Sequence, residues 1–410
     1  MTTIAVFSGD FCRGSSVVRE LIDRTGLRLI TDSDLVARAV ELSGLEERKF
    51  ERLFSTRVSV FNAYTHEKER CLAWLRLALS ELLAGPDLLL SGFLTHLVPG
   101  KLGSVLKVCL IGNTKYRLAV AAEEQGLSER DAAAAIARLD GERSLWTLTT
   151  CEQKDPWEVA LYDIVVPLDK MSTHEAAVLI EKQWRQCEML VGDTPPQSLA
   201  DFRLASEVEV ALVGAGHAVD VSASSGQVEL TINKKVLFLG RLEEQLKDIA
   251  RQVPGVESVQ TRTGKGFHQP DIYRQCDMEA PTRVLLVDDE REFVQTLSER
   301  LSLRDIGSAV AFDGESALKL VHDDEPEVMI LDLKMPGVDG MEVLRQVKNT
   351  RPEVEVIILT GHGSEEDRRK CMELGAFAYL HKPVDIDVLS RELRAANDKI
   401  HQSAGAAGGR

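Results

Sequence analysis

Three features that would place a chain in a well-known class are missing from this sequence. Its seven cysteines are scattered and never form a C-x-x-C pair, so neither a disulfide framework nor a zinc site is indicated. Basic residues are also in deficit, because 49 lysines and arginines face 65 aspartates and glutamates, which gives a net charge of −16. That balance argues against nucleic acid or an anionic membrane as a partner of the whole chain.

Long apolar runs are missing as well. No stretch reaches the ~18 apolar residues that a membrane span needs. The start, Met1 to Ile4, leads directly into a strand pattern without the basic region and apolar core of a signal peptide. We therefore expect no membrane span and a cytoplasmic location. With 410 residues, 44% of them hydrophobic, the chain is long enough for about two to four domains that each bury a core.

Four short apolar runs between residues 283 and 383 end in polar or charged residues. The runs are Val284–Val287 before Asp288 and Asp289, Val328–Leu331 before Asp332, Val356–Leu359 before Thr360, and Ala378–Leu380 before His381 and Lys382. A weaker fifth run is Ser308–Ala311. Segments of mostly helical spacing separate the runs, a pattern typical of buried parallel strands with crossover helices. The carboxyl ends of such strands share one edge of the sheet, where ligands bind.

That edge would gather three carboxylates, a hydroxyl and a lysine. Clustered carboxylates repel one another, so a hard divalent cation such as Mg²⁺ would stabilise them. Thr360 and Lys382 would supply what the oxygens of a phosphoryl group need. The alternative from the residues alone, a doubly wound domain whose edge acids merely cap helices, stays open at this point.

The order Asp-Asp, Asp, Thr, Lys-Pro resembles the receiver domain of two-component response regulators. The resemblance covers residues 283–400 and implies a flavodoxin-like, doubly wound (βα)5 fold with a cis bond before Pro383. It also implies the role of each matching residue. Asp332 would be the phosphoacceptor, Asp288, Asp289, Asp332 and the backbone carbonyl of Lys334 would hold Mg²⁺, Thr360 would sense the phosphoryl group, Lys382 would pair with it, and Tyr379 would be the switch aromatic.

The N-terminal part begins with an apolar strand pattern, Ile4–Phe7, and a glycine-bearing loop. The spacing Gly9-x4-Gly14 is that of a P-loop, in which backbone N–H groups and a helix N-terminus bind phosphate. Ser15 stands where the phosphate-binding lysine is expected, and Ser16 keeps the hydroxyl that meets Mg²⁺. From the loop alone, a tight turn of any α/β domain remains an equal alternative.

Later segments resemble the cytidylate-kinase-like P-loop family over residues 3–185. They are Gly126-Leu127-Ser128 at a helix start, an arginine-bearing lid-like segment, and Leu161-Tyr162-Asp163 before Asp169-Lys170-Met171-Ser172. The resemblance implies a parallel sheet, Mg²⁺ and ATP or another nucleotide. It also implies phosphate contacts from Gly9, Gly14, Ser15, Ser16, Arg117, Arg138 and Arg143. No lysine follows Gly14, and Phe93 replaces an arginine, so we expect impaired catalysis. Solvated helix faces are the alternative explanation of the arginines.

Between these parts, residues 198–263 alternate as helix, strand, strand, helix, strand. The segments Ser225–Leu230 and Val253–Val259 resemble a BON domain, a small αββαβ module associated with lipid or protein contacts. A plain scaffold that joins two larger domains is the alternative that we favour over lipid binding. We expect an α/β multidomain chain with domains at 1–190, 198–263 and 283–400, a linker at 264–282 and a disordered tail at 401–410.

The sequence thus predicts a signalling protein in three parts. Its partner would be a sensor histidine kinase or a phosphotransfer protein, and the P-loop domain and BON-like module would act as output. A homodimer through the receiver stays open. One rival hypothesis is a receiver-regulated kinase of CMP or dCMP, and another is an interaction hub whose assembly changes when the receiver is phosphorylated. No helix-turn-helix pattern follows the receiver, so we do not expect direct transcriptional control.

Overall fold

The computed structural model describes residues 2–55, 59–100, 102–191, 197–236, 238–268, 283–304, 306–361 and 363–407. The chain divides into two compact units. The first contains the N-terminal sheet and the central module, and the second contains the C-terminal sheet. Two short segments, Ser59–Glu67 and Ala215–His217, group with the second unit.

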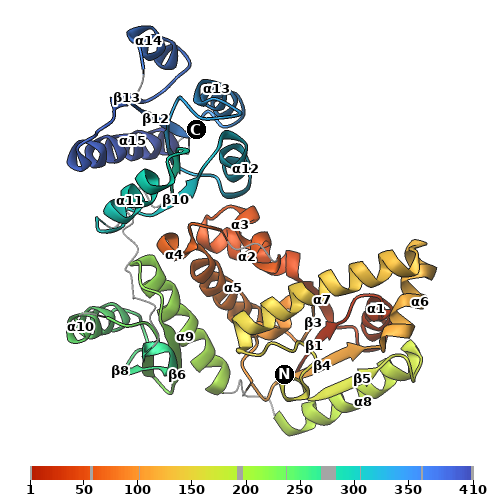
Figure 1. The fold of residues 1–410 in the computed structure, drawn as a ribbon. Helices are drawn as coiled ribbons and strands as arrows, with labels where there is room; N and C mark the ends of the chain where they lie inside the picture. Colours follow the sequence, from red (N-terminus) through yellow and green to blue (C-terminus); the bar gives the residue numbers. More distant parts are fainter. Residues whose placement is uncertain are drawn as a thin grey trace. The chain divides into compact units, whose positions relative to one another are not determined.

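A five-stranded parallel sheet forms the centre of the N-terminal domain (Figure 1). Its strands are β1 (Thr3–Ser8), β2 (Arg28–Thr31), β3 (Leu88–Ser91), β4 (Val105–Ile111) and β5 (Ile164–Pro167). Their order across the sheet is β2-β3-β1-β4-β5, and every neighbouring pair is parallel. Because both faces are covered, most strand residues are apolar, and apart from Lys107 in β4 the polar ones lie at strand ends. The predicted parallel sheet is therefore confirmed.

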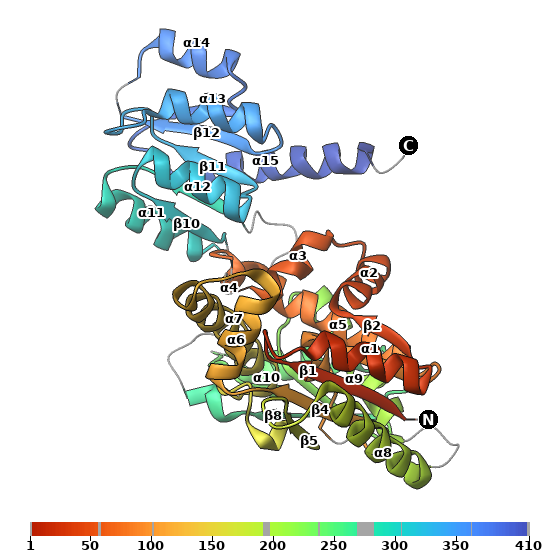
Figure 2. The same ribbon diagram turned by 90° about the vertical axis from the view of Figure 1, so that its right-hand side faces the viewer.

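Helices cover both faces of this sheet. The elements between and after its strands are α1 (Gly14–Thr25), α2 (Asp32–Ser43), α3 (Glu47–Glu51), η1 (Arg52–Phe54), α4 (Asn62–Thr65), α5 (Glu67–Leu83), η2 (Phe93–Leu97), α6 (Thr114–Gln125), α7 (Glu129–Cys151), η3 (Val159–Leu161) and α8 (Thr173–Val191). Helices α1 and α8 pack together on one face (Figure 2), and α2 and α5 pack on the other. Ser172 caps α8, since its hydroxyl accepts the N–H of Glu175 at 3.2 Å.

The central module has the predicted order of elements. These are α9 (Gln197–Gly214), β6 (Asp220–Ser224), β7 (Gln227–Ile232), α10 (Leu239–Ala250) and β8 (Ser258–Thr263), followed by η4 (Lys265–His268). Strands β6 and β7 are antiparallel, and β7 and β8 are parallel. Before the last strand, Gly255 turns with a φ of 91°, and the N–H groups of Glu257 and Ser258 donate to the carbonyl of Gly226.

The C-terminal domain is a second parallel sheet with helices on both faces (Figure 1). Its elements are β9 (Val284–Val287), α11 (Arg291–Ser302), β10 (Ser308–Ala311), α12 (Gly314–Asp324), β11 (Val328–Leu331), α13 (Gly340–Thr350), β12 (Glu355–Thr360), α14 (Glu365–Glu373), β13 (Ala378–His381) and α15 (Ile386–Ala407). The strand order is β10-β9-β11-β12-β13, with all neighbours parallel. This is the doubly wound (βα)5 order that we predicted.

One helix of this domain is longer than the sequence led us to expect. Helix α15 continues to Ala407, past residue 400, where we expected a disordered tail to begin. Alanine has the highest helix propensity, and extending an existing helix is easier than nucleating one, so the alanine-rich segment continues it. Residues 408–410, 192–196 and 269–282, which fall in the predicted tail and linkers, lie outside the described residues. Among those that are described, no helix combines the length and apolar character of a membrane span.

Candidate functional site

The carboxyl edge of the C-terminal sheet brings the predicted residues together. Asp288 follows β9, Asp332 follows β11, Thr360 ends β12 and Lys382 follows β13. A pocket of about 520 Å³ opens at this edge. Its lining residues are Asp289, Glu290, Phe293, Asp332, Lys334, Thr360, Gly361, Lys382 and Pro383. Five of the seven residues predicted for this domain therefore line one pocket, and Asp288 contacts it through Lys382.

Lys382 links the acids of the pocket. Its Nζ lies 2.6 Å from Oδ2 of Asp288, 3.2 Å from Oε1 of Glu290 and 3.5 Å from Oδ2 of Asp332. Burial alone would lower the pKa of Lys382, but its hydrogen bond to Asp288 and the charges of Asp288 and Asp332 outweigh burial and raise the pKa. The ammonium is therefore firmly charged at neutral pH.

The acidic residues form a group that could hold a metal ion. Asp288, Asp289 and Asp332 each offer a carboxylate oxygen, and these oxygens lie within 4.8 Å of one another. Burial raises the pKa of Asp288, while the hydrogen bonds from Lys382 and from the N–H of Glu290 oppose the shift. Three carboxylates in an open pocket fit a hard cation that keeps several waters, which is the preference of Mg²⁺.

The backbone around Asp332 fixes the position of this carboxylate. The N–H of Leu333 donates to Oδ1 of Asp332 at 2.8 Å, so Oδ2 is the oxygen that faces Lys382. Gly340, at the start of α13, passes very close to the same strand end. A Cβ atom on Gly340 would lie 2.0 Å from the carbonyl oxygen of Asp332, so only glycine fits there without a shift of the backbone.

Thr360 and Tyr379 flank Gly363, on the loop that follows β12. A Cβ atom on Gly363 would lie 1.7 Å from the hydroxyl of Tyr379 and 3.1 Å from Cγ2 of Thr360. Thr360 is fully buried, and the Tyr379 hydroxyl is buried without a hydrogen-bond partner among the described residues. A buried hydroxyl without a hydrogen-bond partner is costly. The structure also has the cis bond between Lys382 and Pro383.

Sequence reasoning missed Glu290 as a member of the site. It contributes the third carboxylate around Lys382 and lies at the amino end of α11, where its N–H donates to Asp288 at 2.9 Å. The available signal was its place directly after Asp288 and Asp289.

The N-terminal glycine-bearing loop joins β1 to α1, as predicted. Gly9 and Gly14 bracket the loop, and Ser15 and Ser16 lie in the first turn of α1. Gly14 allows close packing, because a Cβ atom there would lie 2.2 Å from Oγ of Ser8. Two residues without the freedom of glycine, Phe11 and Arg13, have a φ of 56°, which stores strain in the loop.

Two of the three predicted arginines reach this loop. Nε of Arg117 donates to the carbonyl of Asp10 at 2.9 Å, and Nε of Arg143 donates to the carbonyl of Ser8 at 3.1 Å. Arg138 does not join them. Its side chain is 63% exposed and pairs with Glu142 on the outer face of α7. For Arg138 the structure therefore agrees with the alternative of a solvated helix face.

Phe93 stands where the family resemblance implies an arginine, and its ring makes aromatic contacts. Its ring packs against Phe54 and Trp146 at centroid distances of 5.4 and 5.8 Å. The N–H groups of Phe93 and Leu94 donate to the carboxyl group of Asp32 at 3.0 and 2.8 Å. Asp32 thus fixes the turn after β3, and sequence reasoning did not identify that role.

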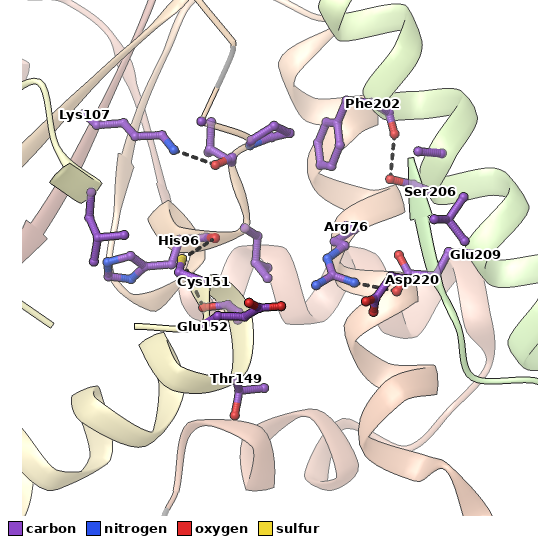
Figure 3. A pocket seen from close by; sticks show the side chains of 18 of the residues that line it. Arg76, His96, Lys107, Thr149, Cys151, Glu152, Phe202, Ser206, Glu209 and Asp220 are labelled. Carbon is purple, nitrogen blue, oxygen red and sulfur yellow. Dashed lines mark hydrogen bonds and ion pairs between the residues drawn. The ribbon is translucent and has the colours of Figure 1, made fainter. Parts of the chain in front are cut away.

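A further cavity of about 500 Å³ lies in the first unit, where α9 meets the N-terminal domain (Figure 3). Several of its charged groups contact partners within the protein. Arg76 pairs with Glu209, and Nζ of Lys107 donates to the carbonyl of Val98 at 2.6 Å. Phe202 of α9 belongs to the same buried cluster as α2 and α5. The module is therefore packed onto the N-terminal domain through a shared core, and we assign no ligand to the cavity.

Comparison with protein families separates the two ends of the chain. Residues 284–394 match the response regulator receiver domain, and residues 4–170 match the cytidylate kinase-like family. The response regulator MprA of Mycolicibacterium vanbaalenii is 36% identical over 115 residues, which are 28% of this chain and 50% of that protein. The transcriptional regulatory protein CpxR of Klebsiella pneumoniae is 40% identical over 121 residues, 30% of this chain and 51% of that protein.

The chain spans about half the length of these curated relatives. Among solved structures, a receiver domain protein from Clostridium thermocellum is 34% identical and covers 28% of this chain and 94% of its own, with a TM-score of 0.28. The match to the BON family is not among these findings, and it remains a resemblance. Residues 284–394 are a response regulator receiver domain, and residues 4–170 are a cytidylate kinase-like domain.

Proposed function

We propose that this protein is a response regulator of a two-component pathway, phosphorylated on Asp332. The donor would be the phosphohistidine of a sensor histidine kinase or of a phosphotransfer protein. The observation that carries the proposal is the position of Lys382, whose ammonium contacts Asp288, Glu290 and Asp332 at the mouth of one pocket. A lysine among carboxylates at the carboxyl edge of a parallel sheet suits a transferable dianion.

The acids would hold Mg²⁺ through Asp288, Asp289, Asp332 and the backbone carbonyl of Lys334. The mutual proximity of three carboxylate oxygens supports this ligand set. When bound, the metal ion neutralises charge on the oxygens of the transferred phosphoryl group. Lys334 lines the same pocket, which supports its place in the ligand set.

The transfer itself requires only one nucleophile from this chain. Oδ2 of Asp332, the oxygen that faces Lys382, attacks phosphorus in line with the phosphohistidine nitrogen. A P–O bond forms as the P–N bond breaks, and the histidine nitrogen keeps the electron pair. Lys382 neutralises the phosphoryl oxygens, because it is already charged and aimed at the acceptor.

Phosphorylation would then act through Thr360 and Tyr379. The hydroxyl of Thr360 would turn toward the phosphoryl oxygens and leave space beside Gly363. Tyr379 would occupy that space and gain a partner for its unsatisfied hydroxyl. Such a local charge event, which biases an element with two positions, changes the surface formed by α14 and β13.

The rest of the chain would read this change. We propose domain limits of 1–190 for the kinase-like domain, 198–263 for the BON-like module and 283–400 for the receiver. The kinase-like domain and the module would act together as output, because they share a buried cluster through Leu199 and Phe202 of α9. A homodimer through the receiver is compatible with this arrangement.

Incubation of the full chain with acetyl phosphate and Mg²⁺ tests the proposal. We expect the wild-type protein to acquire one phosphoryl group that alkali and hydroxylamine remove, as they do an acyl phosphate. Asp332→Asn should remain unlabelled. Asp387→Asn is the matched control, because its side chain is 78% exposed on α15 and makes only a surface ion pair with Arg304. Equal labelling of wild type and Asp332→Asn would remove Asp332 from its role.

A further inference from the structure

Two arginines of the kinase-like domain converge on Asp10, in the loop between β1 and α1. Arg143 forms an ion pair with the carboxylate of Asp10, and Nε of Arg117 donates to the carbonyl of the same residue at 2.9 Å. The loop and the N-terminus of α1 form the place where a phosphate would bind. The cations that would meet such a phosphate are therefore held by a residue of the loop itself.

Further contacts keep both guanidinium groups inside the protein. Arg117 is bidentate with Asp140, at 2.7 Å for each bond, and its side chain is only 6% exposed. The side chain of Arg143 is 11% exposed. Its guanidinium carbon lies 5.7 Å from the ring centre of Phe7 and 5.5 Å from that of Phe93. Each arginine thus uses three donor contacts within the chain.

The remaining phosphate-binding features of the loop are weakened in the same way. A Cβ atom on Gly9 would lie 2.9 Å from Ile111 and 3.3 Å from the ring of Trp157, so these side chains cover the start of the loop. Ser15 offers no positive charge. Arg13, the nearest substitute for a lysine, pairs with Glu123 of α6.

We propose that Asp10 is a built-in competitor for phosphate, so that the kinase-like domain is a non-catalytic platform. The Asp10 carboxylate pairs with the Arg143 guanidinium at the position that a phosphoryl oxygen would otherwise take. A polyphosphate therefore binds only by displacing this carboxylate. The carbonyl of Asp10 likewise accepts a hydrogen bond from Arg117. Neither arginine is then available to neutralise the charge on a phosphoryl group during transfer. This inference does not depend on the receiver, and it opposes the hypothesis of a receiver-regulated nucleotide kinase.

Isothermal titration calorimetry of the full chain with tripolyphosphate tests the competition. We expect Asp10→Asn to bind tripolyphosphate at least about tenfold more tightly than wild type, because a charged competitor of roughly this strength has been removed. Glu142→Gln is the matched control. It removes the charge that pairs with the exposed Arg138 of α7, which does not contact the loop, and should leave the affinity unchanged. Wild type mixed with Mg²⁺, ATP and either CMP or dCMP should form no nucleoside diphosphate.

Two results would overturn the inference. The first is turnover of CMP or dCMP by the wild-type chain, which requires no variant. The second is a folded Asp10→Asn protein, as judged by circular dichroism, whose tripolyphosphate affinity equals or falls below that of wild type. If Asp10→Asn does not fold, Asp10→Ser replaces it, with the same expected increase in affinity for tripolyphosphate. Labelling of Asp332 by acetyl phosphate is measured on the same samples, so failure of the receiver proposal would be seen separately.

Discussion

Replacement of Lys382 by methionine is expected to destabilise the receiver through the carboxylates that it leaves unpaired. Asp288 and Asp332 are 3% and 6% exposed, and both contact the Lys382 ammonium. Removing one partner of a buried ion pair costs about 3 to 5 kcal/mol, because the remaining charge stays buried. Methionine keeps most of the length and apolar volume of the lysine stem, so lost packing contributes little.

Hydrogen exchange measured by mass spectrometry reports this change within the receiver alone. A loss of about 3 kcal/mol corresponds to exchange roughly 100-fold faster in peptides that cover β9 and β11. Mg²⁺ should restore protection more strongly in Lys382→Met than in wild type, because the metal ion then neutralises acids that no lysine shares. Lys370→Met is the control, since its pair with Glu366 on α14 is exposed to solvent and contributes little to stability. Wild-type exchange rates in Lys382→Met would show that Lys382 does not stabilise the buried carboxylates.

Two further predictions concern stability. Burial raises the pKa of Asp32 to about 6 from 3.8, so the folded state retains a proton that the unfolded state loses. The free energy of unfolding should therefore fall by roughly 2 kcal/mol as the pH rises from 4 to 6. Tryptophan fluorescence reports the unfolding of this domain, since all four tryptophans lie in it, at Trp74, Trp146, Trp157 and Trp184. In Asp32→Asn the free energy of unfolding should depend less steeply on pH. An unchanged pH dependence would mean that another group causes it. Gly340→Ala should destabilise the receiver by about 3 kcal/mol or more in denaturant titrations, because its Cβ meets the backbone of Asp332 and Leu333. A Cβ atom at Gly141 in α7 would meet open space, so Gly141→Ala should stabilise the kinase-like domain by about 1 kcal/mol. A Gly340→Ala protein that is as stable as wild type, or more stable, would contradict the packing described for Gly340.

The receiver was largely predictable because its chemistry lies at strand ends. Apolar runs of four residues fix the strands, and the residue that follows each run must lie at the shared edge. Asp288, Asp332 and Lys382 therefore come together whatever the details of packing. Glu290 could not be placed in the same way, because the direction of a side chain in the first turn of a helix depends on local geometry that apolar spacing does not encode.

In the kinase-like domain, the contacts of the arginines could not be predicted in this way. The sequence predicts its sheet and its loop, but the partners of the arginines depend on side-chain packing across α6 and α7. Arg117, Arg138 and Arg143 look equivalent in the sequence, yet two are buried against the loop and one is exposed. The length of α15 was also missed, because glycine and serine among its alanines suggested a tail, whereas the helix is already nucleated by its contacts with the sheet.

Peptide mapping after reductive trapping of the acyl phosphate tests directly whether Asp332 is the phosphoacceptor. The full chain is incubated with a small phosphodonor and Mg²⁺, reduced with borohydride, digested and analysed by mass spectrometry. We expect a reduced side chain at Asp332 and at no other carboxylate. Trapping at Asp288, at Asp289 or within residues 4–170, with Asp332 unmodified, would contradict it.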